Sequence, residues 1–395
     1  MRRSLPLAIS VSGLLLSGCA DAGKAVQVDP PTAGTGSSTR PAKAEGTFAK
    51  EGWFGGPDGL HARIAIKGVE RQGAKSVLRY SVTSLDSSAK SVAFAINLLD
   101  PVGRRLYKPT GSTSGDGFAP GATREMAAEY PAIPQNVEKV TALTPGTAGE
   151  FPGIPVTGTS TDAGTPEDPG IPMGATTTAP STPGGRGAPT GTQSPIGPEG
   201  SAGPSAQASS NPAVLYDVIE GGAEDDASSG SPSASAGSPP GSASRPAGAP
   251  AEFRPEDGKT VASRSARFGE AKRRLDVKPF YRDGAYIVAV FDILNEGPGS
   301  TPANASYTHK DHPGGVFTAF SIQVPGREDV YRAVRIGQVQ PGRPAAYVGS
   351  TRAAFRTAVD APVRGFAYLP APPGDVSSVT FAGGPFGEFE DVPVQ

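Results

Sequence analysis

The sequence predicts an all-β protein with two antiparallel β-sandwich modules joined by a long disordered linker. Three observations predict this class. Apolar residues alternate with small or polar ones in short runs, three blocks of sequence recur in the same order, and a stretch rich in Pro, Gly, Ser and Thr separates the two copies. The modules cover residues 45–156 and 258–395, and the linker covers 157–257. About seven short strands in a copy of this length are typical of a sandwich.

The first 18 residues are typical of an export signal. A pair of arginines precedes an apolar run over residues 5–16, which is far shorter than the ~20 residues that a membrane-spanning helix needs. Leu16-Ser17-Gly18-Cys19 then resembles the bacterial lipobox, whose cysteine receives a diacylglyceryl group and becomes the new N-terminus after cleavage. Cys19 is the only cysteine among 395 residues.

The lipobox resemblance implies lipid attachment at Cys19 and a location at the cell membrane, lipid-anchored on the extracytoplasmic face. Acyl chains anchor a protein at ~0.8 kcal/mol per buried methylene without a spanning helix. Ordinary secretion is the alternative, because Ala20-Asp21-Ala22 also matches a conventional cleavage pattern. Residues 19–44 are predicted to be a disordered tether, since they are rich in Pro, Gly, Ser and Thr.

An internal repeat defines the two modules. Three blocks of the first copy recur in order and at matching spacing in the second. The blocks are Gly103-Arg104 with Leu106-Tyr107 against Gly326-Arg327 with Val330-Tyr331, residues 131–141 against 370–380, and residues 149–156 against 387–394. Chance is a poor explanation for three ordered matches, so we expect both copies to share one fold and one strand order.

Each copy carries the period-2 pattern of half-buried strands. In the first copy, the alternating apolar residues are Ile64 and Ile66, then Leu78, Tyr80 and Val82, then Val92, Phe94, Ile96 and Leu98. In the second copy, they are Leu275 and Val277, then Ile287, Ala289, Phe291 and Ile293, then Phe320, Ile322 and Val324. Each copy ends on Pro-Val, which predicts an edge strand because proline cannot donate to a central ladder.

The repeated segments resemble a telokin-like, Ig-like module. The resemblance lies in a Gly-Arg-x-x-Tyr strand, a Pro-Ala-Pro-Pro-x-Asp-Val-x-x-Val-Thr segment at 370–380, and a Phe-x-x-(Ile/Val)-Pro-Val end. Such modules occur in surface lipoproteins of high-GC Gram-positive bacteria. The resemblance therefore implies two tandem Ig-like sandwiches and no catalytic residues.

The linker is predicted to be disordered because it has little apolar surface to bury. It holds 12 acidic and 3 basic residues, a net charge of −9. One apolar island, Val214-Leu-Tyr-Asp-Val-Ile-Glu220, interrupts it. The island is interpreted either as a strand packed on the edge of one module or as a linear motif that adds a strand to a partner's sheet.

Two groups of side chains are candidate binding residues. His309, Asp311 and His312 lie in an insertion of the second copy and could hold a metal ion, but no fourth ligand is evident and a polar turn is the simpler reading. Trp53 and Phe54 form an aromatic pair that could stack on a sugar ring or anchor a partner, or else fasten the N-terminal arm onto the core. We therefore predict neither a resident metal nor a cofactor.

The sequence favours a non-catalytic cell-surface lipoprotein that presents two binding or scaffolding modules outside the membrane. No hydrolase motif brings Ser, His and acid together, and neither module is basic enough for a nucleic-acid footprint. The expected partners are the membrane, through the lipid, and a component of the cell wall or another surface protein, through the loop 296–317. The alternatives are a passive envelope spacer or a secreted enzyme of unknown type.

Overall fold

The computed structural model describes residues 48–55, 59–111, 116–159, 211–221, 248–268, 270–298, 307–351 and 361–395. These residues belong to one compact unit, Gly46–Gln395. They form strands and turns with a single 3₁₀ turn, η1 (Gly384–Phe386), so the described chain is all-β, as the sequence predicts. The sequence pattern succeeds because short runs of alternating apolar residues cannot bury one face as helices.

The N-terminal half, residues 48–159, contains ten strands. They are β1 (Phe48–Phe54), β2 (Leu60–Gln72), β3 (Lys75–Ser84), β4 (Lys90–Val92), β5 (Asn97–Asp100), β6 (Arg105–Tyr107), β7 (Asp116–Phe118), β8 (Thr123–Pro131), β9 (Lys139–Leu143) and β10 (Glu150–Thr159). One sheet has the order β1-β2-β3-β8 and faces a second with the order β6-β5-β9-β10. The end of β10 also pairs in parallel with β2, which joins the two sheets along one side.

The C-terminal half, residues 262–395, repeats this arrangement. Its strands are β12 (Ala262–Phe268), β13 (Ala271–Val277), β14 (Tyr281–Asp283), β15 (Tyr286–Asn295), β16 (Phe320–Gln323), β17 (Val330–Ile336), β18 (Ala346–Tyr347), β19 (Val363–Pro370), β20 (Ser378–Gly383) and β21 (Glu388–Pro393). The orders β12-β13-β15-β19 and β17-β16-β20-β21 match those of the N-terminal half strand for strand. A parallel bridge between Phe280 and Val394 stands where β2 pairs with β10.

Each half has its own apolar core between its two sheets. Residues at equivalent positions of the repeat fill both cores: Tyr107 and Tyr331, Val140 and Val379, Phe151 and Phe389, Ile154 and Val392 are all at most 2% exposed. The repeated blocks are thus the inward-facing positions of the late strands. This is the constraint that keeps such positions alike in a duplicated sandwich.

The Pro-Val ending of the first copy does not mark an edge strand, contrary to expectation. β10 lies between β9 and β2, and it changes neighbour along its length. Glu150–Pro155 pairs with β9, across a bulge between Phe151 and Ile154, and Val156–Thr159 pairs with β2. Pro155 stands where one ladder ends and the other begins, so its missing N–H removes little from the sheet.

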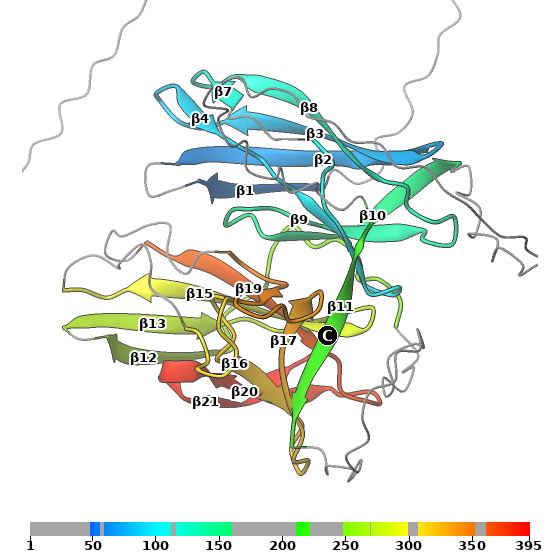
Figure 1. Ribbon diagram of the computed structural model, residues 1–395. Helices are drawn as coiled ribbons and strands as arrows, with labels where there is room; N and C mark the ends of the chain where they lie inside the picture. The colour runs from blue at the N-terminus through cyan, green and yellow to red at the C-terminus, as the bar shows by residue number, and fades with distance from the viewer. Residues whose placement is uncertain are drawn as a thin grey trace, which may run out of the picture. The chain divides into compact units, whose positions relative to one another are not determined.

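The island in the predicted linker forms β11 (Ala213–Glu220), which pairs with strands of both halves. It is antiparallel to β17 over Leu215–Glu220 and antiparallel to β6 over Ala213–Val214. Figure 1 shows β11 running alongside β17. Through β11 the C-terminal sheet that contains β17 joins the sheets of the N-terminal half in one continuous sheet of fourteen strands, whereas β12, β13, β14, β15 and β19 form a separate sheet within the described residues. The edge-strand interpretation of the island was therefore correct, but β11 covers two edges instead of one.

Several sequence predictions fall outside the described residues. These are the signal peptide at 1–18, the lipid-attachment residue Cys19, the tether at 19–44, and residues 160–210 and 222–247 of the linker. The last ten residues of the predicted linker, 248–257, are described and pack against both halves. Among the described residues, no helix is long and apolar enough to span a bilayer.

Candidate functional site

The structure separates the predicted aromatic pair. Phe54 is fully buried and packs on Phe94 with ring centroids 5.0 Å apart, whereas Trp53 lies on the opposite face of β1. The Trp53 ring stacks on His61 with centroids 4.5 Å apart and planes 7° apart. Phe54 is therefore a residue of the N-terminal core, which agrees with the alternative that it fastens the N-terminal arm. The reason is the two-residue period of a strand, which sends neighbours to opposite faces.

The histidine cluster does form, and it faces β11. The His309 and His312 rings stack with centroids 5.2 Å apart, and His309 Nδ1 lies 3.8 Å from an Asp311 carboxylate oxygen. His312 Nε2 is 2.7 Å from Oε1 of Glu220, the last residue of β11. Arg332 Nε lies 2.7 Å from the other oxygen of Glu220.

The contacts of the Glu220 carboxylate explain the direction in which its pKa is shifted. Partial burial would raise its pKa, but the hydrogen bonds from His312 and Arg332 outweigh burial and lower it. The pKa of His309 is lowered by partial burial and by the charges of Arg332 and His312. In the described part of the chain, no group of three or more His, Cys, Asp and Glu side chains could hold a metal ion. In the structure, His312 and Arg332 contact Glu220 and so hold the end of β11.

A third apolar cluster joins the two halves, and we call this contact the junction. It contains Leu99, Leu106 and Leu143 of the N-terminal half, Leu215 of β11, and Tyr281, Tyr286, Val288, Val290, Val334, Val348, Phe366 and Tyr368 of the C-terminal half. β15 is the clearest case, since Val288 and Val290 face the junction while Ala289 and Phe291 face the C-terminal core. A strand buried on both faces is typically a continuous apolar run, and residues 286–291 are such a run.

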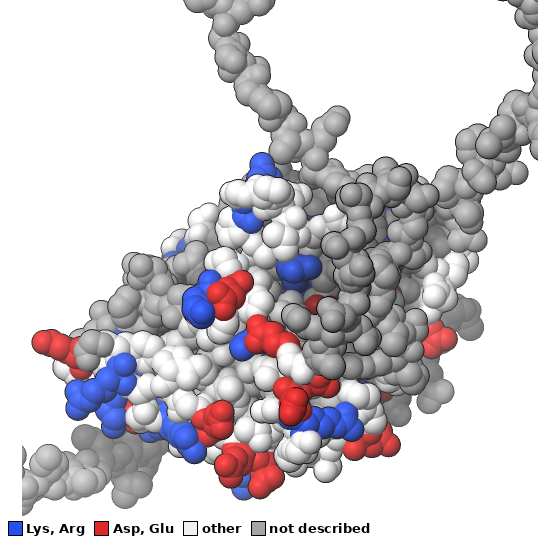
Figure 2. Space-filling model, turned by 60° about the horizontal axis from the view of Figure 1, so that its bottom comes forward, with Lys and Arg blue, Asp and Glu red and all other residues white. Residues whose placement is uncertain are grey.

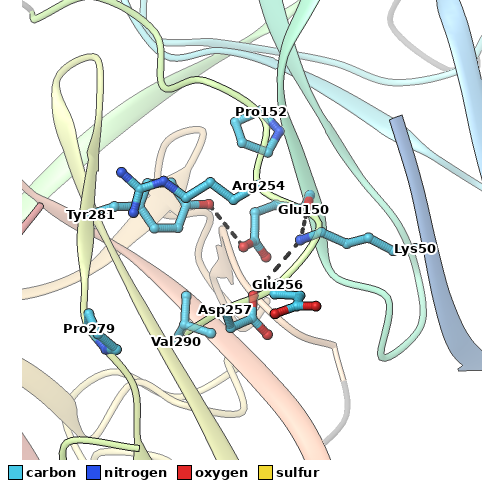
Figure 3. Close-up of a pocket in the computed structure, with 9 residues that line it drawn as sticks. All are labelled: Lys50, Glu150, Pro152, Arg254, Glu256, Asp257, Pro279, Tyr281 and Val290. Atoms are coloured by element: carbon cyan, nitrogen blue, oxygen red, sulfur yellow. Dashed lines mark hydrogen bonds and ion pairs between the residues drawn. The ribbon is translucent and has the colours of Figure 1, made fainter. Parts of the chain in front are cut away.

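Buried charges lie beside this apolar contact (Figure 3). Glu150, at the start of β10, is 1% exposed and accepts a hydrogen bond from the Tyr281 hydroxyl at 2.9 Å. Two guanidinium nitrogens of Arg364, in β19, donate hydrogen bonds to the same carboxylate at 2.7 and 3.0 Å. Arg364 also binds both oxygens of Asp257, in the segment that precedes β12. One guanidinium therefore ties together three segments that are distant in sequence.

The electrostatics of this cluster follow from its burial. Burial alone would disfavour the charged guanidinium, but Glu150 and Asp257 outweigh it and raise the pKa of Arg364 well above its ordinary value. Burial lowers the pKa of Lys50, whose Nζ donates to the Glu150 carbonyl at 3.0 Å and lies 3.9 Å from Asp257. Burial likewise raises the pKa of Tyr281 well above 10.

A second buried carboxylate bridges the halves nearby. Asp283 is fully buried and accepts hydrogen bonds from Thr141 of β9 at 2.8 Å, from the Tyr368 hydroxyl at 2.9 Å and from the Ala251 backbone at 2.9 Å. Burial raises the pKa of the Asp283 carboxyl despite these donors. Buried polar groups of this kind are costly unless they are paired, so the hydrogen bond from Thr141 helps to fix how the two halves meet.

The cavity beside these charges is too small for a substrate. It has a volume of about 20 Å³ and is lined by residues that include Lys50, Glu150, Asp257 and Tyr281. That volume suits about one water molecule. Both oxygens of Glu150 are occupied by Arg364 and Tyr281, an arrangement that holds the carboxylate in place and leaves it poorly suited to act as a general base.

Sequence reasoning missed these residues, although one of them carried a signal. Arg364 is the only charged residue of β19, Val363-Arg-Gly-Phe-Ala-Tyr-Leu-Pro370, and a lone charge in an apolar strand calls for a buried partner. Glu150 carried no such signal in the sequence. Its repeat equivalent, Glu388, also follows a glycine but is exposed on the C-terminal half. Identical Gly-Glu dipeptides thus take different roles, since only one of the two copies presents this face to the other half.

The surface beyond the junction carries mixed charge. Figure 2 shows one face on which Lys and Arg residues are interspersed with Asp and Glu residues. Among the described residues, exposed ion pairs include Lys67 with Glu125 and Lys75 with Glu129. Exposed pairs of this kind contribute about 0–1 kcal/mol each, so they stabilise the fold much less than the junction does.

Fold and site together define a class: an all-β, β-sandwich-like protein whose halves are joined through a shared strand and buried ion pairs. Comparison with protein-family models, curated proteins and solved structures finds no match to this chain.

Proposed function

We propose that the chain is a non-catalytic lipoprotein of the cell envelope that presents two Ig-like modules as a single scaffold on the outer face of the membrane. The junction carries this proposal. Arg364, Asp283 and β11 hold the halves to one another, so surfaces on both halves keep a fixed relation. A fixed pair of modules suits simultaneous contact with an extended partner, because no ordering cost arises when the second module engages.

The strand order supports the Ig-like part of the proposal. β2-β3-β8 in one sheet and β6-β5-β9-β10 in the other correspond to strands A-B-E and C′-C-F-G of an Ig sandwich. The resemblance of the repeat to telokin-like modules points the same way.

The anchor rests on the sequence Leu16-Ser17-Gly18-Cys19. Its test is metabolic labelling with an alkyne fatty acid, followed by membrane fractionation of wild type and Cys19→Ala. Wild type should be labelled and sediment with membranes, whereas the variant should be unlabelled and either released or left uncleaved. A Cys19→Ala chain that is cleaved and still retained would contradict the anchor. An N-terminus in the Ala20–Ala22 region of the wild-type protein would indicate ordinary secretion instead.

Partner contact is proposed at the exposed residues of the distal loop. In the described part of loop 296–317, Tyr307 and Phe317 are buried and stack on each other, while the side chains of Lys310 and Asp311 are 85% and 60% exposed. Exchanging the whole loop would remove the buried Tyr307, so Lys310→Ala with Asp311→Ala is the cleaner test. Retention of purified cell wall by the anchorless chain should fall in this double variant with thermal unfolding unchanged. Equal retention would exclude the loop, and absence of any retention would favour the passive spacer.

A further inference from the structure

β11 pairs with the edges of two strands, β6 and β17, and side chains along its length hold it there; we call these two strand edges together the groove. Leu215 is 3% exposed and belongs to the apolar cluster of the junction. Asp217 forms an ion pair with Arg104 of the N-terminal half, and Glu220 is held by Arg332 and His312 of the C-terminal half. The groove therefore selects one strand by shape, by an apolar anchor and by the sign of two charges.

The backbone completes this recognition. The Leu215 N–H donates to the Arg104 carbonyl at 3.1 Å, and the Gly337 N–H donates to the Val214 carbonyl at 2.9 Å. Without β11, two residues of β6 (Arg105 and Leu106) and five residues of β17 would lose their partner on this side. Unpaired strand edges accept any strand that fits them, which is the physical basis of strand addition.

The covalent connections place no close limit on which copy of the chain supplies β11. Fifty-one residues separate Thr159 from Asn211, and twenty-six separate Gly221 from Gly248. At ~3.3 Å per residue these spans reach at most about 170 and 85 Å, several times the width of a domain. Lengthening a connection of this size costs little additional closure entropy.

From these observations we infer that the groove between β6 and β17 is a strand-acceptor site and that a second copy of this chain can supply its β11. Two copies that exchange β11 regain every contact of the single chain. The free-energy cost of exchange is therefore only the cost of bringing in β11 from a separate chain instead of from the same chain. A covalent tether provides an effective concentration on the order of millimolar. Exchange therefore becomes substantial as the protein concentration approaches that value, as it does when copies are confined to a surface.

The test uses two full-length copies that form a disulfide only when strands are exchanged. Arg105 and Val214 lie opposite each other in the β6–β11 register, and both are exposed. Cα atoms directly opposite in such a pair are close enough to be bridged. In a Cys19→Ser background, one copy carries Arg105→Cys and a second copy, with a larger tag, carries Val214→Cys. They are unfolded together, refolded at about 0.5 mM and mildly oxidised.

The expected result is a disulfide-linked heterodimer that is at least ~10-fold more abundant than in a matched control. The control replaces Arg105→Cys by Lys67→Cys, an exposed position on β2 that does not pair with β11. Adding Leu215→Asp to the copy that donates the strand should abolish the excess, since it places a charge at the apolar anchor. A double variant with both cysteines in one chain checks the geometry and should close internally at low concentration.

Two results would overturn the inference. Heterodimer no more abundant than the Lys67→Cys control, with normal internal closure of the double variant, would show that β11 stays with its own chain. Failure of the double variant to close, in a chain whose circular dichroism is native, would refute the register itself. Because both cysteines stand at exposed positions, folding should survive. Light scattering of the refolded Cys19→Ser chain, which should show a dimer that persists on dilution, provides an independent measurement.

Discussion

Removing the Arg364 side chain should destabilise the protein more than removing any exposed charge. Its side chain is 13% exposed and bonds two carboxylates, Glu150 at 1% and Asp257 at 22% side-chain exposure. In Arg364→Ala, Glu150 keeps only the Tyr281 hydroxyl as a side-chain donor, and Asp257 keeps only Lys50 at 3.9 Å among these junction groups. Breaking a buried pair by removing one partner costs about 3–5 kcal/mol. The partial exposure of Asp257 places our expectation near the lower value, about 3 kcal/mol.

The measurement is urea unfolding, monitored by two spectroscopic signals. Trp53 is the only tryptophan and lies on β1, so its fluorescence reports the N-terminal half, whereas far-UV circular dichroism reports both halves. In wild type the two transitions should coincide. In Arg364→Ala they should move to lower urea and separate, because each half has its own core and the loss of the Arg364 ion pairs weakens the coupling between the halves.

Two variants serve as controls. Lys67→Ala breaks an exposed pair and should cost about 0–1 kcal/mol. Glu150→Gln should cost about 2 kcal/mol, whereas Glu388→Gln at the equivalent position of the repeat is exposed and should cost less than about 0.5 kcal/mol. The reasoning fails if Arg364→Ala falls within the range of Lys67→Ala, or if the two Glu→Gln variants are equally stable.

Three further predictions concern other contacts. Leu215→Ala should lower the free energy of unfolding by about 2–4 kcal/mol, since it opens the junction cluster, whereas its neighbour Val214, 47% exposed, should tolerate alanine with little change in thermal denaturation. Arg71 is 6% exposed and donates to several backbone carbonyls of the N-terminal half, so Arg71→Ala should cost about 2–4 kcal/mol while Arg79→Ala, 57% exposed, costs less than about 1 kcal/mol in urea unfolding. Burial would raise the pKa of Asp257, but its basic partners outweigh burial and lower it. Its contribution to the free energy of unfolding is therefore complete above the ordinary pKa of about 3.9 and is lost as pH falls through the lowered value. Asp257→Asn should make stability less dependent on pH in that acidic range.

The all-β class and the repeated strand order could be predicted from sequence because both depend on local alternation and on blocks that fill equivalent core positions. Val140 and Val379 are buried for the same reason in both halves. The junction could not be predicted in the same way. The alternation of Ile287, Ala289 and Phe291 drew attention to one face of β15, although the apolar residues between them, Val288 among them, indicated that both faces are buried.

The candidate site was predicted least well, since its contacts join residues far apart in sequence. Glu150 and Arg364 are 214 positions apart, and Glu150 looks the same in sequence as its exposed counterpart Glu388. The island at 214–220 was recognised as a strand from its composition, but its two neighbours depend on how the halves meet. His312 was recognised as a polar residue of interest, and its partner Glu220 followed only once that strand was in place.

The position of β11 also gives the protein a reserve of length under mechanical load. The halves are connected by β11 and by the chain on either side of it, 51 residues before Asn211 and 26 after Gly221. A force that pulls the halves apart must first break the hydrogen bonds of β11 and the ion pairs of Arg364, because these short contacts bear tension before the longer covalent path does. Their rupture releases residues 160–247, which can extend by up to about 290 Å at ~3.3 Å per residue while each core remains folded. The contacts would re-form when the load falls, so the two halves can separate under force and rejoin without unfolding.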